Sequence, residues 1–297
     1  MAEGGGPLTS TPQGEEPLKH NTEFKRSTAM ESFIYWFDYI CNDLGPGPAF
    51  LPMRYYINFH KGGMPFLILG MMIYYENFSL GNWVYLALHG SYGLFWIIKD
   101  YTFPDTSFER KVTLICFIVA WFIVISPYSY GAYLLASGVA PQDPSPERVC
   151  IVVMMYCFGL VFMMGADGQK YFTLRVKKGL MNDGFMKWSR NPNYVGEMLI
   201  YSSFALTVQR YEPWCILAYM WTLIFLSRML QKDYSLSKKS GWKEYEATSW
   251  MLPFKFGGST AISVVIYGVS FYIVAFCLMN DGIEGAARKV FYTKKVI

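Results

Sequence analysis

The chain has 297 residues, of which 53% are hydrophobic and only 16% are charged. Soluble domains are about 45–50% apolar and about 25% charged, so this composition favours a membrane protein. Aromatic residues reach 19%, which is typical of rings at headgroup depth and of helix bundles that enclose a flat apolar ligand. The net charge of +4 excludes a general polyanion-binding surface, and the composition argues against a disordered chain, a fibre or a nucleic-acid module.

The amino-terminal part of the chain divides into a tail and an interfacial segment. Residues 1–30 are rich in Gly, Pro, Ser, Thr and charge, have no apolar signal-peptide core, and are predicted to be a disordered tail. Residues 31–52 follow. Their first part, Glu31–Ile40, is too short to span and is predicted to be an interfacial helix, whereas the Gly-Pro repeats after it prevent a helix.

Residues 53–297 are predicted to form one all-α transmembrane domain, a polytopic helix bundle of about seven spans. The fifth and sixth spans are separated only by the turn Gln209–Pro213, so we expect them to form a tight antiparallel hairpin. The predicted spans are Tyr56–Tyr75, Leu80–Ile98, Val112–Ala136, Cys150–Ala166, Tyr194–Val208, Trp214–Leu230 and Thr260–Met279.

Two loops carry most of the positive charge. Six Lys and Arg residues lie between the fourth and fifth spans and five between the sixth and seventh, and both loops fall on one face of the membrane. The segment Lys99–Lys111 is expected on that same face. Cytosolic loops are enriched in Lys and Arg, so both basic loops are predicted to be cytosolic. His60 and Lys61, at the mouth of the first span, are interpreted as interfacial anchors.

The stretch Asp167–Glu197 is interpreted as a loop that runs into the next membrane helix and carries binding groups. Arg190 offers a planar guanidinium suited to phosphate, and Pro192 fixes the backbone before a helix N-terminus that also favours an anion. Glu197 lies inside an apolar run, where an ionisable residue suggests a functional site. The alternative is a structural ion pair of Glu197 with Arg190 or Lys170.

These residues carry a family resemblance. The run Gly184–Glu197 (GFMKWSRNPNYVGE), with Gly179–Leu180 before it, resembles the signature of the steroid 5-alpha-reductase C-terminal family. Its relatives include the sterol reductases and, more remotely, the isoprenylcysteine and phospholipid methyltransferases. The resemblance extends over residues 167–254, through Asp167-Gly-Gln-Lys170 and the closing Gly, Tyr and Pro positions of the second basic loop. One departure is Asn191, which stands where the family has His and cannot carry charge near neutral pH.

The resemblance implies a membrane-embedded reductase with NADPH bound between the cytosolic loops and the C-terminal helices, and a steroid-like or other lipid enone held deeper in the bundle. Hydride would go to the β-carbon, and a hydrogen-bond donor would meet the charge that develops on the carbonyl oxygen. No metal site is expected. The cofactor-pocket residues that it implies are Asp167, Gln169, Lys170, Arg190, Asn193, Tyr194, Glu197, Arg228, Asp233 and Tyr245.

The amino-terminal half should supply the donor. His89 and Tyr92 are three residues apart on one face of the second span, and Glu76 ends the first span. We predict that Tyr92 is the catalytic donor, with His89 and Glu76 as helpers. The alternative is that these side chains only pack, as most of the 23 tyrosines must.

Two other functions remain open from the sequence. One is an S-adenosylmethionine-dependent membrane methyltransferase of the same fold, and the other is a non-catalytic family member that serves as a subunit of a membrane complex, which Asn191 leaves open. The predicted location is the endoplasmic reticulum, with the mitochondrial inner membrane as the alternative. Lys294 and Lys295 resemble a dilysine retrieval tail, but seven spans place them on the far side, so they are interpreted as interfacial charges.

Overall fold

The computed structural model describes residues 29–291. Most of the predicted tail, and the lysines Lys294 and Lys295, therefore lie outside the described residues. The described chain is an all-α protein with one short antiparallel strand pair. The helices and strands are α1 (Ala29–Asn42), β1 (Leu51–Pro52), α2 (Met53–Tyr74), α3 (Leu80–Tyr85), α4 (Ser91–Thr102), β2 (Lys111–Val112), α5 (Leu114–Ala120), α6 (Tyr130–Ala136), α7 (Pro146–Val176), α8 (Pro192–Val208), α9 (Glu212–Met220), α10 (Leu226–Ser237), α11 (Trp242–Thr248), α12 (Thr260–Leu278) and α13 (Gly282–Phe291).

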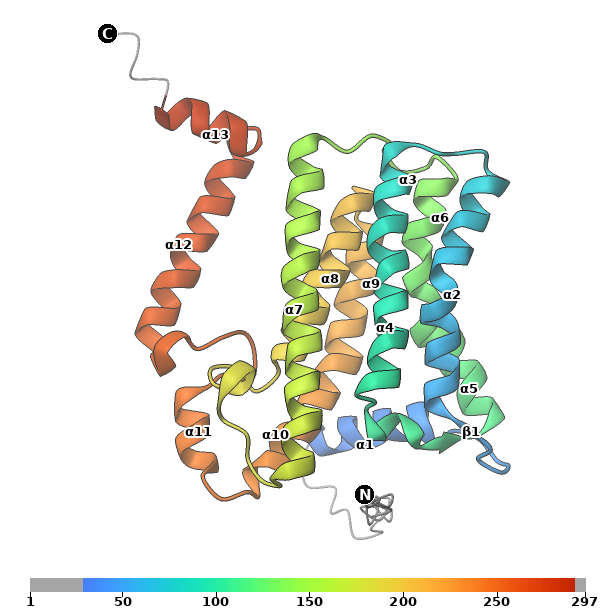
Figure 1. Ribbon diagram of the computed structural model, residues 1–297, viewed down its shortest axis with the longest axis vertical. Coiled ribbons are helices and arrows are strands. Elements are labelled where there is room, and N and C mark those ends of the chain that lie inside the picture. The colour runs from blue at the N-terminus through green and yellow to red at the C-terminus, as the bar shows by residue number, and fades with distance from the viewer. Residues whose placement is uncertain (1–28, 292–297) are drawn as a thin grey trace, which may run out of the picture.

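The helices stand side by side and run alternately up and down (Figure 1). Short π-helical or 3-10 turns join α3 to α4, α5 to α6 and α9 to α10, so each pair forms one long column. These columns, with α2, α7, α8 and α12, overlap every span predicted from the sequence. The predicted hairpin of the fifth and sixth spans is confirmed, since Gln209 adopts a left-handed conformation and reverses the chain between α8 and α9.

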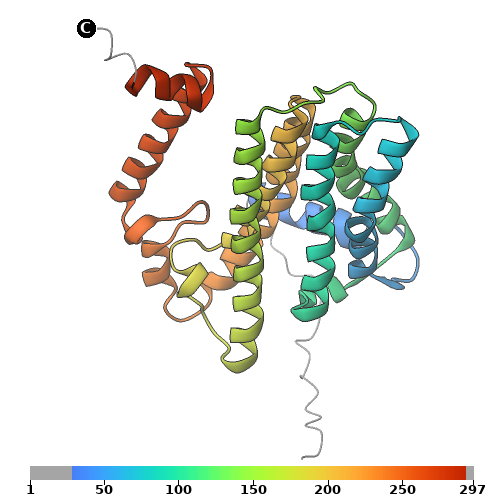
Figure 2. The same cartoon turned by 45° about the horizontal axis from the view of Figure 1, so that its top comes forward.

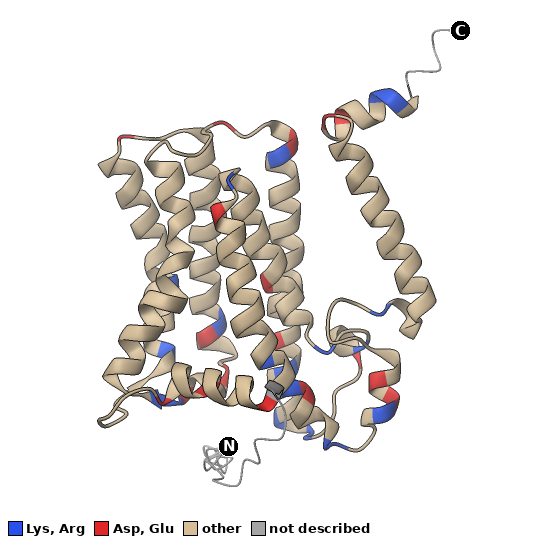
Figure 3. Cartoon of the chain, turned by 180° about the vertical axis from the view of Figure 1, so that it is seen from behind, with Lys and Arg blue, Asp and Glu red and all other residues tan. Residues whose placement is uncertain are grey.

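Within residues 29–291, four helical columns are long and apolar enough to cross a membrane, namely 114–136, 146–176, 212–237 and 260–278. The chain is therefore an integral membrane protein, and seven crossings remain a prediction. Charged residues gather at the end of the bundle where α1, α10 and α11 lie (Figure 3). Both predicted basic loops lie at that end.

The segment predicted to be interfacial is helical in its first part, where α1 runs from Ala29 to Asn42. Helix α1 lies across the end of the bundle rather than along it (Figures 1 and 3). Its Trp36 and Ile40 side chains are exposed, as expected for a helix that rests in the headgroup layer. The chain after α1 is not helical until β1, which pairs with β2 through Leu51 and Val112.

Helix α12 stands apart from the rest of the bundle (Figures 1 and 2). Two hydrogen bonds link this region to the residues around it. The Tyr267 hydroxyl of α12 donates to the carbonyl oxygen of Phe254 at 2.9 Å, and the Glu147 carboxylate of α7 accepts from the backbone N–H of Ile283, in α13, at 2.7 Å.

One boundary prediction is wrong. The fourth span was expected to end at Ala166 and the following residues to form a loop, but α7 continues to Val176. No Gly-Pro or other strong helix breaker follows Ala166, so the helix extends beyond the apolar run into charged residues. Asp167, Gln169 and Lys170 are thus helical, and the first basic loop comprises only residues 177–191.

Two glycines set the distance between α7 and α8. A Cβ on Gly159 would lie 2.7 Å from the carbonyl oxygen of Gly196, and a Cβ on Gly196 would lie 2.5 Å from the carbonyl oxygen of Gly159. Such small residues let membrane helices approach closely. Helix α8 carries Glu197 next to this contact, so the glycine pair also fixes the position of that carboxylate.

We predict that Gly196→Val destabilises the fold, because its side chain would force α7 and α8 apart. Overpacking of this kind costs about 1–3 kcal/mol. The measurement is the thermal unfolding midpoint of the purified protein in detergent. Gly63→Val is the matched control, since nothing lies within 4 Å of a Cβ at Gly63. Equal midpoints for the two variants would contradict the close contact.

Candidate active site

Inside the bundle, three helices bring one ammonium and two phenols together. Lys61 of α2 donates from Nζ to the hydroxyl oxygens of Tyr92 in α4, at 2.7 Å, and of Tyr201 in α8, at 3.1 Å. The two hydroxyls are themselves 3.1 Å apart. Tyr92 is 1% exposed, so its hydroxyl is held in a water-poor interior. This placement contradicts the interpretation of Lys61 as an interfacial anchor, because its neighbours on α4 and α8 offer hydrogen bonds that lipid cannot.

The local sequence explains how Lys61 and Tyr92 meet. Pro65 has no N–H to donate to the carbonyl oxygen of Lys61, four residues before it. Gly93 in α4 has no side chain and packs directly against that carbonyl. Helices α2 and α4 therefore come close at this level, which brings Tyr92, the residue before Gly93, beside the Lys61 side chain.

The two predicted helpers of Tyr92 have different positions. His89 is buried in the π-helical turn between α3 and α4, where its Nδ1 lies 3.0 Å from the Tyr85 hydroxyl and its ring stacks on Phe204 at 4.3 Å. Tyr92 contacts the same Phe204 ring, so His89 belongs to the surrounding packing. Glu76 lies in the exposed turn after α2, at the end of the bundle away from the basic loops. The structure does not bring Glu76 to Tyr92.

A second group of paired charges lies between the cluster and the basic loops. Lys99 of α4 and Asp167 of α7 form a buried ion pair at 2.8 Å. The Trp96 ring lies between the two lysines, with Lys61 Nζ 3.5 Å and Lys99 Nζ 4.4 Å from its centroid. Asp167 therefore neutralises Lys99, and Lys61 has no such partner in direct contact.

Glu197 forms neither of the ion pairs considered from the sequence. Arg190 pairs with Asp233 instead, and Lys170 pairs with Asp105 at 3.6 Å. Within residues 29–291 the Glu197 carboxylate makes no direct hydrogen bond or ion pair, although Lys61 and Lys99 are within electrostatic reach. It is half-buried one helical turn before Tyr201, so it lies between the Lys61 cluster and the entrance of α8.

Arg190 is a structural residue in this fold. Its Nε and Nη2 donate to the Asp233 carboxylate at 2.8–3.0 Å, and its Nη1 donates to the carbonyl oxygen of Ser249 at 2.9 Å. The side chain also lies against the Trp242 ring, and the residue is 8% exposed. Arg190 was expected to offer its guanidinium to phosphate, but Asp233, 43 positions away, already accepts its hydrogen bonds.

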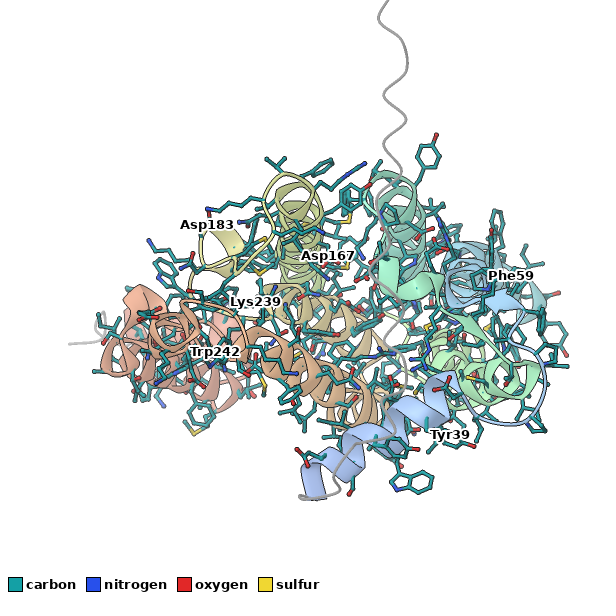
Figure 4. The ribbon with its side chains drawn as sticks, turned by 90° about the horizontal axis from the view of Figure 1, so that it is seen from below. Tyr39, Phe59, Asp167, Asp183, Lys239 and Trp242 are labelled. Atoms are coloured by element: carbon teal, nitrogen blue, oxygen red, sulfur yellow. The ribbon has the colours of Figure 1, made fainter. Side chains whose placement is uncertain are left out.

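The two basic loops are joined to one another around Arg190. Backbone N–H groups of Arg190 and Trp250 donate across the loops, and the buried Tyr245 hydroxyl donates to the carbonyl oxygen of Met186 at 2.6 Å. Burial raises the pKa of Tyr245, so it stays a neutral donor. Gln169 fixes the first loop, accepting from Phe185 N–H at 2.9 Å and donating to Asp183. Figure 4 shows the loops that carry Asp183 and Lys239 next to one another.

Lys170 and Asp105 form an ion pair at the end of the bundle that carries the basic loops. Burial raises the pKa of Asp105, but Lys170, the Ser107 N–H and Lys99 outweigh it and hold that pKa at about 2. Lys232 of α10 lies in the same region and donates to the carbonyl oxygen of Arg190 at 2.7 Å. The region thus retains positive charge that is not fully neutralised by its own carboxylates.

The entrance of α8 has polar groups without partners, which is where the resemblance implies NADPH. The side-chain oxygens of Asn191 and Asn193 are buried and accept no hydrogen bond within the described residues. Arg228 makes no direct ion pair or hydrogen bond there either, and it acts electrostatically on Tyr194. Unpaired buried acceptors suit amide or ribose donors, and a free guanidinium suits phosphate. The residues present therefore fit a pyridine dinucleotide, and Arg228 rather than Arg190 has a guanidinium without a direct partner among the described residues.

Comparison with known proteins gives one match. A family model described as "Protein of unknown function (DUF1295)" matches residues 103–249, just under half of the chain. No curated protein matches, and no solved structure matches. The matching stretch contains α5 to α11 and both basic loops. It begins after α2 and α4, which supply Lys61 and Tyr92.

We predict that Arg190→Ala destabilises the protein, in contrast to a solvent-facing phosphate ligand, because it leaves the Asp233 carboxylate unpaired. Removing one partner of a buried ion pair costs about 3–5 kcal/mol. Thermal unfolding in detergent measures the effect. Arg288→Ala is the control, since Arg288 and Glu284 form an exposed pair whose loss should change little. An Arg190→Ala variant as stable as wild type would rule out the structural role.

Proposed function

We propose that this integral membrane protein is an NADPH-dependent reductase of a steroid-like or other lipid enone. The single observation that carries the proposal is the Tyr92 hydroxyl, 2.7 Å from Lys61 Nζ and 3.1 Å from the Tyr201 hydroxyl. A phenol O–H beside an ammonium is a good hydrogen-bond donor for an oxygen that gains negative charge. Low water content strengthens that interaction.

The residues proposed to hold the cofactor are those with free hydrogen-bonding capacity at the α8 entrance. Asn191 and Asn193 offer unpaired side-chain oxygens, Arg228 offers a guanidinium, and the Tyr194 ring, stacked on Phe225 at 4.8 Å, closes one side. When bound, NADPH supplies the hydride. The role of this chain is to hold the dinucleotide on the side of the basic loops, so that the enone lies between the dinucleotide and Tyr92.

Apolar rings beside Tyr201 support a lipid as the substrate. Tyr128, Tyr201, Phe204 and Leu217 line a space of only about 30 Å³, so these side chains would have to move apart to admit a lipid. The Tyr128 ring stacks on Tyr201 at 4.7 Å. Stacked rings of this kind offer flat apolar walls. The proposal therefore places the apolar body of the substrate against these rings and its carbonyl oxygen at Tyr92. The endoplasmic reticulum is the proposed location.

The test begins with purified protein in lipid nanodiscs, NADPH and a panel of lipid enones, with S-adenosylmethionine as the competing cofactor. We expect NADPH binding and enone-dependent NADPH consumption. Binding of S-adenosylmethionine alone would favour the methyltransferase alternative. Binding of neither, with folded protein, would favour the non-catalytic alternative.

We predict that Tyr92→Phe lowers kcat about 100-fold or more and leaves the Kd for NADPH nearly unchanged, because it removes a donor used in the transition state. The measurement is steady-state turnover of an enone from the panel, with NADPH binding followed by fluorescence. Tyr156→Phe is the matched control, since Tyr156 is a buried bundle tyrosine whose hydroxyl, within the described part of the chain, meets only Ser91, at 2.6 Å. If Tyr92→Phe turned over like Tyr156→Phe, Tyr92 would have no part in the reaction.

A further inference from the structure

Lys61 carries a positive charge that no directly contacting carboxylate balances. Within the described residues its Nζ donates only to phenol oxygens, those of Tyr92 and Tyr201, and lies over the Trp96 ring. Phenols and an indole face stabilise a cation less than a carboxylate does. Lys61 is half-buried, and a cation held partly away from water without an anionic partner is costly. The arrangement therefore favours the binding of an anion, or of an oxygen that becomes anionic, next to the Lys61 ammonium.

The other charged groups near Lys61 do not fill that place. On its own helix, His60 faces Ser129 and Trp121. On α4 and α7, Lys99 and Asp167 neutralise one another. On α8, Glu197 acts on Lys61 only electrostatically and without a direct pair. The remaining facing groups are the neutral phenols of Tyr92, Tyr128 and Tyr201.

We infer that Lys61 is the positioning residue that makes Tyr92 an acid, and that it restricts the substrate to conjugated carbonyl compounds. This inference rests on the proposed reductase function. Reduction of an isolated C=C bond places no negative charge on an oxygen, so the ammonium would not stabilise it. Reduction of an enone turns the carbonyl oxygen into an enolate oxygen, which the ammonium stabilises.

Reduction of an enone at this site moves one hydride to carbon and one proton to the carbonyl oxygen. When the β-carbon gains a hydride, the C=C pair shifts to join the α-carbon and the carbonyl carbon, and the carbonyl π pair moves onto oxygen. That oxygen takes the proton of Tyr92. The Tyr92 oxygen takes a proton from the Lys61 ammonium, and the neutral amine regains a proton from water. The enol then becomes the saturated ketone when its α-carbon takes a proton from water and its O–H releases one to water.

The test uses an alkyl-substituted naphthol, whose absorption band distinguishes the neutral naphthol from the naphtholate. It needs neither NADPH nor turnover. We expect wild-type protein to bind the probe with a ratio of naphtholate to naphthol that falls about tenfold or more in Lys61→Met, because a nearby opposite charge shifts an acid pKa by about one to three units. Lys61→Arg keeps the charge and should retain most of the naphtholate.

The outcomes separate this inference from the proposed function. Equal naphtholate fractions in wild type and Lys61→Met, or no probe binding to wild type, would overturn the role of Lys61. A Lys61-dependent naphtholate without enone turnover would count against the reductase and leave the charged site in place. Lys111→Met, at an exposed lysine of β2, controls for a general effect of charge. If Lys61→Met does not fold, Lys61→Gln takes its place: a similar loss of naphtholate is the supporting result, and its retention is the contrary one.

Discussion

The hydrogen bonds from Lys61 to Tyr92 and Tyr201 are the interaction around which the bundle is organised. An ammonium inside an apolar helix bundle cannot rely on water, so its donors must be met by side chains of neighbouring helices. Helices α2, α4 and α8 supply those contacts, and Pro65 and Gly93 let α2 and α4 approach closely enough. The glycine contact of α7 with α8 then brings Glu197 to the same interior.

Below this cluster the polar groups fall into two sets with different tasks. Arg190, Asp233 and Tyr245 satisfy one another and the loop backbone, so they hold the two basic loops together. Arg228, Asn193 and Glu197 retain unused hydrogen-bonding capacity within the described residues. A folded interior seldom leaves polar atoms unpaired. A bound ligand would therefore add the most hydrogen bonds at the second set. The scaffold set fixes the entrance of α8, which carries Asn193 and Glu197, whereas Arg228 comes from α10.

The sequence allowed the helices to be predicted well, because apolar length and Gly/Pro breaks act locally along the chain. Glu197 could be singled out for the same reason, as a carboxylate within an apolar run. Lys61 and Tyr201 could not be found, since which of 23 tyrosines meets a given lysine depends on how α2, α4 and α8 pack. Arg190 was misassigned because its partner Asp233 is distant in sequence, and α7 was cut short because charge was taken as the end of the helix.

The most direct measurement of the central claim follows the hydride itself. The protein in nanodiscs is supplied with a lipid enone that it turns over and with NADPH deuterated at the transferable position of the nicotinamide ring, and the product is analysed by mass spectrometry and NMR. The account predicts one deuterium at the β-carbon of a saturated ketone and none at the α-carbon, which receives a proton from solvent. Deuterium at the former carbonyl carbon, or a product without deuterium, would contradict it.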